Sequence, residues 1–292
     1  MKIMSFNVCS LRTWGDFDSA EWLEWKMTLK EIVEYNNVDI VLLQEVYKFE
    51  PNFINDLSSF LGNDISVIST ESYSNCNRNL HNAVFYSPAL FGNRVEDLTK
   101  DFWSYQNRNN NFQVIKFGLG SRELILVNVH LASDGNAKIV EGSEHAEDLR
   151  NLEQLLTCLE NQFPNAYIMA GGDFNFSNDL LSKHFSDNQV LTNWLLDDEN
   201  TTGKGTQTTL TQAGQMGNAM DHFIFNSNLK NRIRKQAFND NPNDPWDFVL
   251  GVLHITRNGT TQIKIGNYKE VSFQDYHATI SDHFPIITEL NI

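Results

Sequence analysis

Cysteine is scarce in this chain of 292 residues, which contains only Cys9, Cys76 and Cys158. Their number is odd, their spacing is wide, and none of them lies in a zinc-binding pattern. We therefore expect free thiols in a reducing compartment, with one disulfide and a spare thiol as the alternative. Long apolar runs are also missing, so no segment could span a membrane. The N-terminal apolar run is too short for a signal-peptide core, and we expect a cytoplasmic protein by default, with export by another route left open.

Basic residues are few as well, since 22 Lys and Arg stand against 37 Asp and Glu and give a net charge of −15. Proteins that bind the nucleic-acid backbone usually carry a basic face, because the release of counterions supplies the affinity. The charge balance therefore argues against a stoichiometric DNA-binding module. It still allows an enzyme whose acidic residues hold a cation. The best local candidate for a phosphate contact is the cluster of Lys230, Arg232, Arg234 and Lys235. A solvated surface is the simpler explanation of this cluster.

Apolar residues make up 41% of the chain and aromatic residues 12%, which is enough for a substantial core. Apolar runs predict strands at residues 2–8, 39–44, 83–86, 112–117, 124–129, 166–170, 222–225 and 279–290. Helical spacing of apolar residues predicts helices at residues 20–35, 51–61 and 141–162. Several neighbouring strands have no helix between them. We therefore expect an α/β fold with a mixed sheet, or with two packed sheets and helices outside.

The long connection over residues 228–275 contains β-like runs at residues 248–255 and 261–265, which fit one or two projecting hairpins. We find no internal repeat, low-complexity tract or linker. The expected organisation is therefore a single domain over residues 1–292 with a hairpin-type insertion at about residues 228–275.

Three short motifs, far apart in the chain, combine an acid with an amide or imidazole at the end of a β-like run. In α/β proteins the ends of strands are where catalytic side chains gather. Asp, Asn and His serve as ligands of hard cations, phosphate donors and proton carriers, and cleavage of a phosphate ester needs all three roles. The motifs are Gly172-Asp173-Phe174-Asn175, Met220-Asp221-His222-Phe223 and Ser281-Asp282-His283-Phe284-Pro285.

Three more polar residues interrupt or end β-like runs, and each has a structural explanation when taken alone. Asn7 could make a local hydrogen bond at a strand end, and His130 could be a satisfied structural histidine. Glu45 could cap a turn. It could also be a metal ligand, because a divalent cation makes a carboxylate favourable at the rim of the core.

The segment around Asp173 favours function over an ordinary turn. Two preceding glycines, Gly171 and Gly172, let the backbone turn sharply and approach a ligand. Asp173 and Asn175 would then point the same way on an extended segment, whereas an Asx turn is the alternative.

Asp282 and His283 are neighbours, and neighbouring side chains in a regular strand point to opposite faces. His283 could act as a general base if a carboxylate orients it, and Asp221 is the candidate. His145, in a highly charged stretch, is expected on a solvated helix face.

In chain order, six segments resemble the motifs of the endonuclease/exonuclease/phosphatase superfamily, the group of deoxyribonuclease I-like enzymes. Each segment is weak alone, but six in the right order, from residue 7 to residue 283, are specific. The resemblance implies a four-layer α/β sandwich, in which two mixed β-sheets pack face to face with helices on the outside. The segments are Asn7, Gln44-Glu45, Asn128-Val129-His130-Leu131, Gly172-Asp173-Phe174-Asn175, Met220-Asp221-His222 and Ser281-Asp282-His283.

The resemblance also implies hydrolysis of phosphate esters with Mg²⁺, for which Mn²⁺ could substitute. Asn7 and Glu45 would lie at the metal site, and Asp282 would assist the metal or orient the base. Asp173 and Asn175 would position or activate water and hold the phosphate. The remaining roles are a hydrogen bond from His130 to the phosphate and a His–Asp pair formed by His283 and Asp221. Whether His283 removes a proton from water or stabilises the phosphate is left open.

Two branches of the superfamily fit poorly. Abasic-site endonucleases carry Tyr where this chain has His130, and Asn218-Ala219-Met220-Asp221 lacks the Trp-Cys-Asp-Arg signature of inositol-polyphosphate phosphatases. We therefore predict a monomeric, metal-dependent phosphodiester hydrolase, first of all an endonuclease acting on DNA or RNA. The alternatives are a sphingomyelinase-type enzyme on a lipid headgroup or another small phosphoester, and a catalytically silent binding protein.

Overall fold

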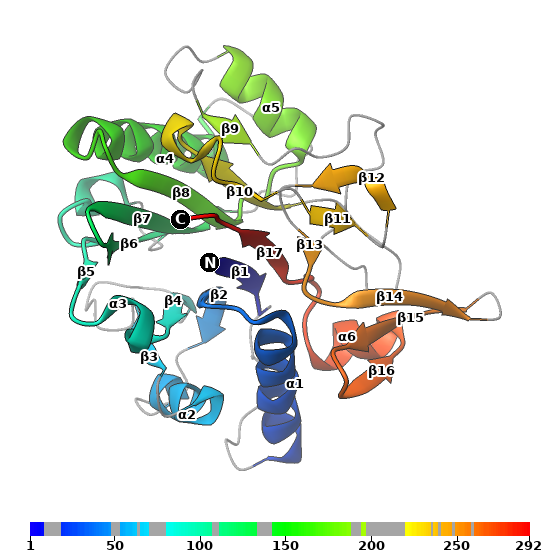
Figure 1. The fold of residues 1–292 in the computed structure, drawn as a ribbon. Coiled ribbons are helices and arrows are strands. Elements are labelled where there is room, and N and C mark those ends of the chain that lie inside the picture. The colour runs from blue at the N-terminus through cyan, green and yellow to red at the C-terminus, as the bar shows by residue number, and fades with distance from the viewer. Residues whose placement is uncertain are drawn as a thin grey trace.

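The computed structural model describes residues 1–8, 19–47, 53–62, 65–69, 80–106, 111–132, 142–187, 194–196, 220–234, 236–238, 241–246, 249–257 and 260–292. Within these residues, two six-stranded sheets face each other and the larger helices cover their outer surfaces (Figure 1). This is the four-layer α/β sandwich that the sequence motifs predicted. None of the described helices combines the length and the apolar character needed to cross a membrane.

The first sheet has the strand order β13-β17-β1-β2-β4-β3. β1 and β2 run parallel, and the other neighbours are antiparallel. In sheet order the strands are Val249–Leu250, Ile286–Glu289, Lys2–Asn7, Ile40–Tyr47, Leu80–Tyr86 and Ser66–Ser69.

The second sheet has the strand order β5-β6-β7-β8-β10-β9. Here β7 and β8 form the parallel pair. In sheet order the strands are Val95–Asp97, Phe112–Leu119, Arg122–His130, Tyr167–Asp173, Asp221–Phe225 and Leu195–Leu196.

Each parallel strand pair is joined by a long amphipathic helix whose N-cap residue is a serine. The side chain of Ser19 accepts a hydrogen bond from the Trp22 amide at the start of α1, and Ser143 accepts one from the Ala146 amide at the start of α4. The helices are α1 (Ala20–Asn36), α2 (Phe53–Leu61), α3 (Pro88–Phe91), α4 (Glu144–Gln162), α5 (Asn178–Asp187) and α6 (Phe273–Thr279).

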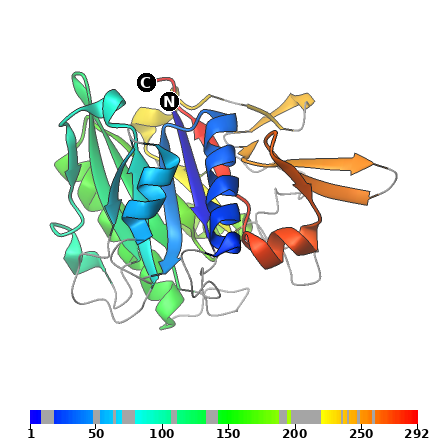
Figure 2. The same cartoon turned by 90° about the horizontal axis from the view of Figure 1, so that it is seen from below.

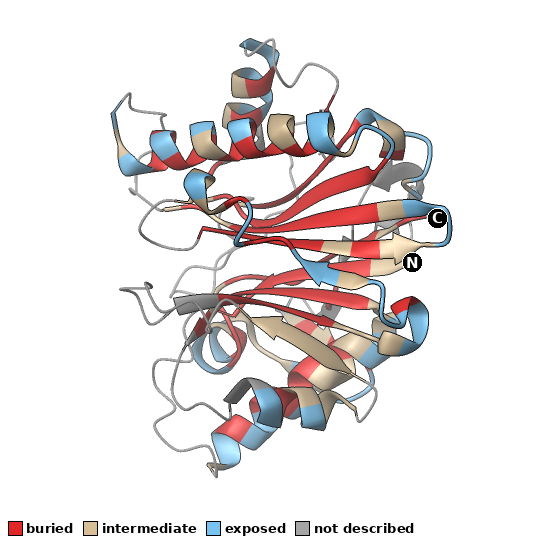
Figure 3. Cartoon of the chain, turned by 90° about the vertical axis from the view of Figure 1, so that its left-hand side faces the viewer, coloured by how far each residue is buried: buried red, intermediate tan, exposed pale blue. Residues whose placement is uncertain are grey.

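The core is divided by the second sheet, as the burial pattern shows (Figure 3). Alternate residues of β7 point to opposite faces: Leu124 and Leu126 belong to the cluster between the sheets, and Ile125 and Val127 to the cluster under α4. β7 is therefore buried on both faces, which explains why it is a continuous apolar run.

The segment after residue 228 adds two small sheets, β11-β12 and β14-β15-β16. β14 and β15 pair from Leu253↔Lys264 to Arg257↔Thr260 and form a hairpin that extends away from the two main sheets (Figure 2). The strands are Gln236–Phe238, Asn241–Trp246, Leu253–Arg257, Thr260–Ile265 and Lys269–Val271.

The strand predicted at residues 279–290 is wrong in its first half. Helix α6 ends at Thr279, and β17 begins only at Ile286. Pro285 lacks the backbone N–H that a strand ladder requires, so the segment before it is irregular. Both termini lie at the same end of the first sheet, where the Met1 ammonium donates to the Leu290 carbonyl at 2.8 Å.

Candidate active site

The polar motifs meet at one end of the sandwich because both parallel strand pairs end there. Asn7 is the last residue of β1, and Glu45 lies near the end of β2. On the facing sheet, His130 ends β7 and is paired with Asp173 at the end of β8. β10 begins at the same end, and its first residue, Asp221, is also paired with Asp173.

His283 reaches this group from the irregular segment before β17. Its Nδ1 donates to Asp221 Oδ2 at 2.8 Å, and both side chains are buried. Its Nε2 then faces Asp173 Oδ2 at 3.8 Å. Although burial lowers the pKa of His283, the negative charges of Asp221 and Asp173 raise it to about 10. His283 is therefore an imidazolium at neutral pH in this arrangement.

Asp173 is the central carboxylate of the site. Its Oδ2 accepts a hydrogen bond from Asn7 Nδ2 at 2.9 Å, and its Oδ1 accepts one from the Asn175 amide at 2.8 Å. Burial raises the pKa of Asp173, the positive charge of His283 opposes that rise, and the net direction is upward. A carboxyl group with a raised pKa that lies near His283 Nε2 is suited to accept a proton from water.

Asn175 is held by an Asx turn rather than by the extended segment that the spacing predicted. It has φ of 53°, its amide donates to Asp173, and its side chain donates to the Leu131 carbonyl at 2.8 Å. The turn still brings both polar side chains together, since Asn175 Nδ2 lies 3.2 Å from Asp173 Oδ2. The Asx turn is therefore present, and it leaves both polar side chains side by side.

Glu45 occupies a bulge in β2 and has φ of 55°, which is unusual for a residue with a side chain. Its Oε1 lies 3.4 Å from His130 Nε2 and 3.3 Å from Asn7 Nδ2. Burial raises the pKa of Glu45, but the hydrogen bonds and charge of His130, with the hydrogen bond of Asn7, lower it to about 2. Glu45 is therefore ionised at neutral pH.

Ser281 fixes the segment that carries Asp282 and His283. Its hydroxyl donates to the Asn7 carbonyl at 2.7 Å and accepts from the His283 amide at 3.0 Å. The irregular backbone brings both following side chains to the site, with Asp282 Oδ1 3.8 Å from His283 Nε2. That oxygen is buried and accepts no hydrogen bond from any described residue.

The site fits a divalent cation by its charge and its donor atoms. Four carboxyl groups and two imidazoles lie together, so net negative charge remains even with both imidazoles protonated. Carboxylate and amide oxygens are the ligands that Mg²⁺ prefers. Atoms of Asp173, Asp221 and His283 also lie within 4.8 Å of one another, a spacing compatible with metal binding. His283 Nδ1 is already hydrogen-bonded to Asp221, so Glu45, Asp282 and Asn7 fit the cation better.

The two glycines before Asp173 allow close packing rather than a sharp turn. Both lie inside β8. A Cβ at Gly172, which has φ of 155°, would lie 1.9 Å from the Val129 carbonyl oxygen, and a Cβ at Gly171 would lie 2.6 Å from the Phe223 ring. The glycines therefore let β7 and β10 approach β8, which brings His130 and Asp221 to Asp173.

Two buried histidines lie behind the site, and the solvated position predicted for His145 is wrong. His145 lies on the buried face of α4, not on a solvated face, with its ring stacked on Phe176 and Nε2 3.4 Å from the Phe174 carbonyl oxygen. His222 Nε2 lies 2.9 Å from the Phe176 carbonyl oxygen. The signal for His145 was present, because it is placed four residues before Leu149 on the apolar stripe of α4.

Tyr276 of α6 lies near the site and was not predicted from the sequence to do so. Its hydroxyl is buried without a hydrogen-bond partner among the described residues, and burial with the charges of Asp221 and Asp282 raises its pKa. The helix had a sequence signal, because Ser272 and Asp275 form the capping pattern that the structure contains.

The predicted basic cluster is not part of this group of side chains. Lys230 follows the far end of β10, and Arg234 pairs with Glu289 at 2.8 Å, near the chain termini. Arg232 belongs to the same end, where its carbonyl accepts from the Asn291 amide. Lys235 lies outside the described residues. Lys230, Arg232 and Arg234 are thus separated from the polar side chains around Asp173 by the length of the strands.

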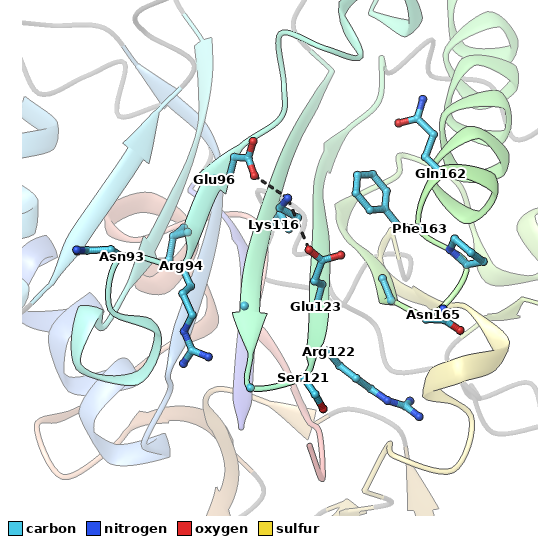
Figure 4. A pocket seen from close by; sticks show the side chains of 15 residues that line it. Asn93, Arg94, Glu96, Lys116, Ser121, Arg122, Glu123, Gln162, Phe163 and Asn165 are labelled. Atoms are coloured by element: carbon cyan, nitrogen blue, oxygen red, sulfur yellow. Dashed lines mark ion pairs between the residues drawn. The ribbon is translucent and has the colours of Figure 1, made fainter.

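A cavity of about 630 Å³ also lies away from the polar side chains around Asp173, between the outer face of the second sheet and the end of α4. Lys116 crosses it, 2.6 Å from Glu96 and 3.7 Å from Glu123, and the guanidinium groups of Arg94 and Arg122 point away from Lys116 (Figure 4). The cavity is large, but none of the residues that line it belongs to the sequence motifs, so its size alone does not make it the reactive site.

Residues 4–283 match the sequence model of the Endonuclease/Exonuclease/phosphatase family. Because the match covers nearly the whole chain, the chain belongs to this family, whose members are phosphoester hydrolases and generally depend on a divalent metal. No curated protein matches the chain significantly in sequence.

Solved structures share the fold at low sequence identity. D. rerio TDP2, solved with a single-strand DNA product, is 14% identical, with a TM-score of 0.59 over 100% of this chain and 99% of that one. A mannosyl-6-phosphatase from Bacteroides thetaiotaomicron is 13% identical, with a TM-score of 0.57 and 99% of both chains covered. The human Nocturnin catalytic domain, with bound sulfate, is 16% identical, with a TM-score of 0.57 over 99% of this chain and 93% of that one.

Proposed function

We propose that this protein is a divalent-metal-dependent phosphodiester hydrolase that cleaves DNA or RNA within the strand. The observation that carries the proposal is the aligned set Asp221–His283–Asp173, with the ionised Glu45 beside it. A hydrogen-bonded His–Asp pair facing a second buried carboxylate is costly for a structural core, because buried charges need partners. Such a set is suited to the transfer of a proton and the stabilisation of phosphate charge.

In this proposal, Glu45, Asp282 and Asn7 would hold the cation, with Mg²⁺ first and Mn²⁺ as a substitute. When bound, the cation would neutralise charge on the phosphate oxygens. Glu45 contributes a full negative charge because its pKa is about 2.

The remaining residues would act on the phosphate and the attacking water. His130 is a donor, since burial lowers its pKa but Glu45 raises it, and the net direction is upward. His283, kept cationic by Asp221, would donate from Nε2 to the phosphate. Asp173 would accept the proton of water, and Asn175 would hold the water or a phosphate oxygen through its side chain.

Nucleic acid is proposed as the substrate because TDP2 of D. rerio, which shares the fold, was solved with a single-strand DNA product. A small phosphoester, including a lipid headgroup, is the second candidate, because the net charge of −15 opposes the approach of a polyanion. A single domain with the insertion at residues 228–275, acting as a monomer, completes the proposal.

A panel of substrates tests the proposal directly. Purified protein with Mg²⁺ is given supercoiled plasmid, single-stranded DNA, RNA, sphingomyelin vesicles and a sugar phosphate, each beside an EDTA control. The proposal expects metal-dependent cleavage of a nucleic acid with internal cuts. Cleavage of sphingomyelin or the sugar phosphate alone would move the assignment to the second candidate. If folded protein that binds Mg²⁺ cleaves none of them, the nucleic-acid proposal fails.

A further inference from the structure

A chain of buried amide side chains joins the two sheets directly beneath the proposed metal site. Asn128 on β7 accepts a hydrogen bond from Gln44 Nε2 on β2 at 2.6 Å. Gln44 also donates to the Ser5 hydroxyl on β1 at 3.1 Å. Asn128 Nδ2 lies 3.5 Å from Gln113 Oε1 on β6. All four side chains are buried, so each polar atom depends on these partners.

The same chain meets β2 where the ladder with β4 is interrupted. Leu43 pairs with Ala83, and the next pair is Val46 with His81. Two residues of β2, Gln44 and Glu45, therefore stand opposite a single residue of β4, as in a β-bulge. The bulge gives Glu45 its positive φ and turns its carboxylate toward Asn7 and His130.

Asn128, on the opposite sheet, contacts both strands, β2 and β4, next to this interruption. Its Nδ2 donates to the Leu43 carbonyl at 3.0 Å and to the Ala83 carbonyl at 3.3 Å, the last regular pair before the bulge. The main-chain carbonyl oxygen of Asn128 also accepts a hydrogen bond from Asn82 Nδ2 at 3.4 Å, opposite the bulge. One side chain thus contacts the strand before the bulge, the residue in it and the partner strand.

We infer that Asn128 is a positioning residue, which clamps the β2 bulge so that the Glu45 carboxylate is presented to the cation. A residue other than glycine keeps a positive φ only where surrounding contacts fix it, and Asn128 supplies those contacts. The inference rests on the proposed metal-dependent function. Groups that orient a metal ligand commonly change metal affinity by about 10- to 100-fold when replaced.

The test is the affinity for Mn²⁺ without substrate, measured by calorimetry and by electron paramagnetic resonance of free Mn²⁺. Asn128→Ala should raise the dissociation constant about tenfold or more. Asn128→Leu, which keeps the branching of the side chain but removes its polar atoms, serves if the first variant does not fold. The matched control is Asn226→Ala, because Asn226 is an equally buried amide that bonds to the backbone of Ile168 and Ala166, outside the chain that contains Asn128. The control should lose thermal stability and keep its Mn²⁺ affinity.

A double-mutant cycle with Glu45→Gln separates clamping from a general loss of structure. If Asn128 acts through Glu45, its replacement should have little further effect on Mn²⁺ affinity in the Glu45→Gln background. Equal losses in both backgrounds, or an unchanged affinity in folded Asn128→Ala, would overturn the clamp while leaving the proposed function in place. A wild-type protein that binds no Mn²⁺ would instead contradict the proposed metal dependence, and the clamp with it.

Discussion

Asp173 receives hydrogen bonds from two elements and faces His283, so its charge organises the site more than any other. The Asp173→Asn substitution keeps the shape and removes the negative charge that would accept a proton. We expect it to lower turnover by about 10²–10⁴-fold with the fold intact. The measurement is kcat beside a thermal melt, and Asp101→Asn, at an exposed turn, is the control that should keep full activity. Near-wild-type turnover in folded Asp173→Asn would remove Asp173 from the reaction.

The Asp221–His283 pair predicts how stability depends on pH when the metal is removed. The pKa of His283 in the folded chain is raised from an ordinary value of 6.5 to about 10 by the neighbouring carboxylates. Its contribution to stability is therefore complete below pH 6.5 and is lost as the pH rises through 10. In EDTA, the difference in unfolding free energy between wild type and His283→Gln should shrink over this range. A difference that stays constant in urea titrations from pH 6 to pH 10 would contradict the assignment.

The polar residues that meet at the site were all named from sequence motifs, but the residues that hold them in place were not predicted. His130 ends a predicted strand and Asp173 follows one, so both were expected at the end of a strand, whereas Asn7 was expected within the first strand. The bulge at Glu45 could not be predicted, because its positive φ depends on Asn128, a residue 83 positions away on the other sheet. His145 was assigned to solvent because its neighbours are charged, although its spacing from Leu149 indicated the buried face.

At the scale of elements, the packing of β7 against β8 determines whether His130 and Asp173 align. A Cβ at Gly172 would overlap the Val129 carbonyl, and the φ of 155° is itself unfavourable for other residues. Gly172→Ala should cost about 1–3 kcal/mol from backbone strain, with steric displacement in addition, and should lower kcat. Gly120→Ala is the control, because Gly120 has φ of 63° with no atom near its missing Cβ. The control should lose some stability but keep kcat; equal kcat in both variants would refute the packing argument.

Irregular segments limited what could be predicted about the elements themselves. The apolar run at residues 279–290 predicted a strand, yet only Ile286–Glu289 pairs with β1. Ser281 instead bonds to the end of β1 and directs Asp282 and His283 toward the site. Such a segment follows tertiary hydrogen bonds rather than periodicity, which is why the sequence indicated its residues but not its shape.

At the scale of the whole molecule, the position of the basic cluster predicts a dependence on substrate length. β8, which has seven residues, separates the cluster from the polar side chains around Asp173 by roughly 20 Å. Replacing Lys230, Arg232 and Arg234 with Ala should weaken binding of long DNA and flatten its salt dependence, while cleavage of a dinucleotide stays unchanged. Affinities for both substrates measured between low and physiological salt check this. An unchanged salt slope on long DNA would remove the cluster from the binding surface.

The overall fold was more predictable than any single element, because it followed from the order of the motifs. The alternation of helices and strands indicated an α/β fold, and the strands without helices between them indicated a mixed sheet or two packed sheets. The four-layer sandwich itself was implied by the family resemblance. The short helix α5 and the strands β3 and β5 were missed, since each has few apolar residues of its own. Composition set only a boundary on function, through the acidic net charge.

The most direct test of the whole account is nicking of supercoiled plasmid by wild-type protein and by Asp173→Asn, each with Mg²⁺ and with EDTA. We predict nicking by the wild type that EDTA abolishes, and loss of nicking in the variant at unchanged thermal stability. Nicking that survives EDTA, or that proceeds equally well in the folded variant, would contradict a metal-dependent reaction at this site.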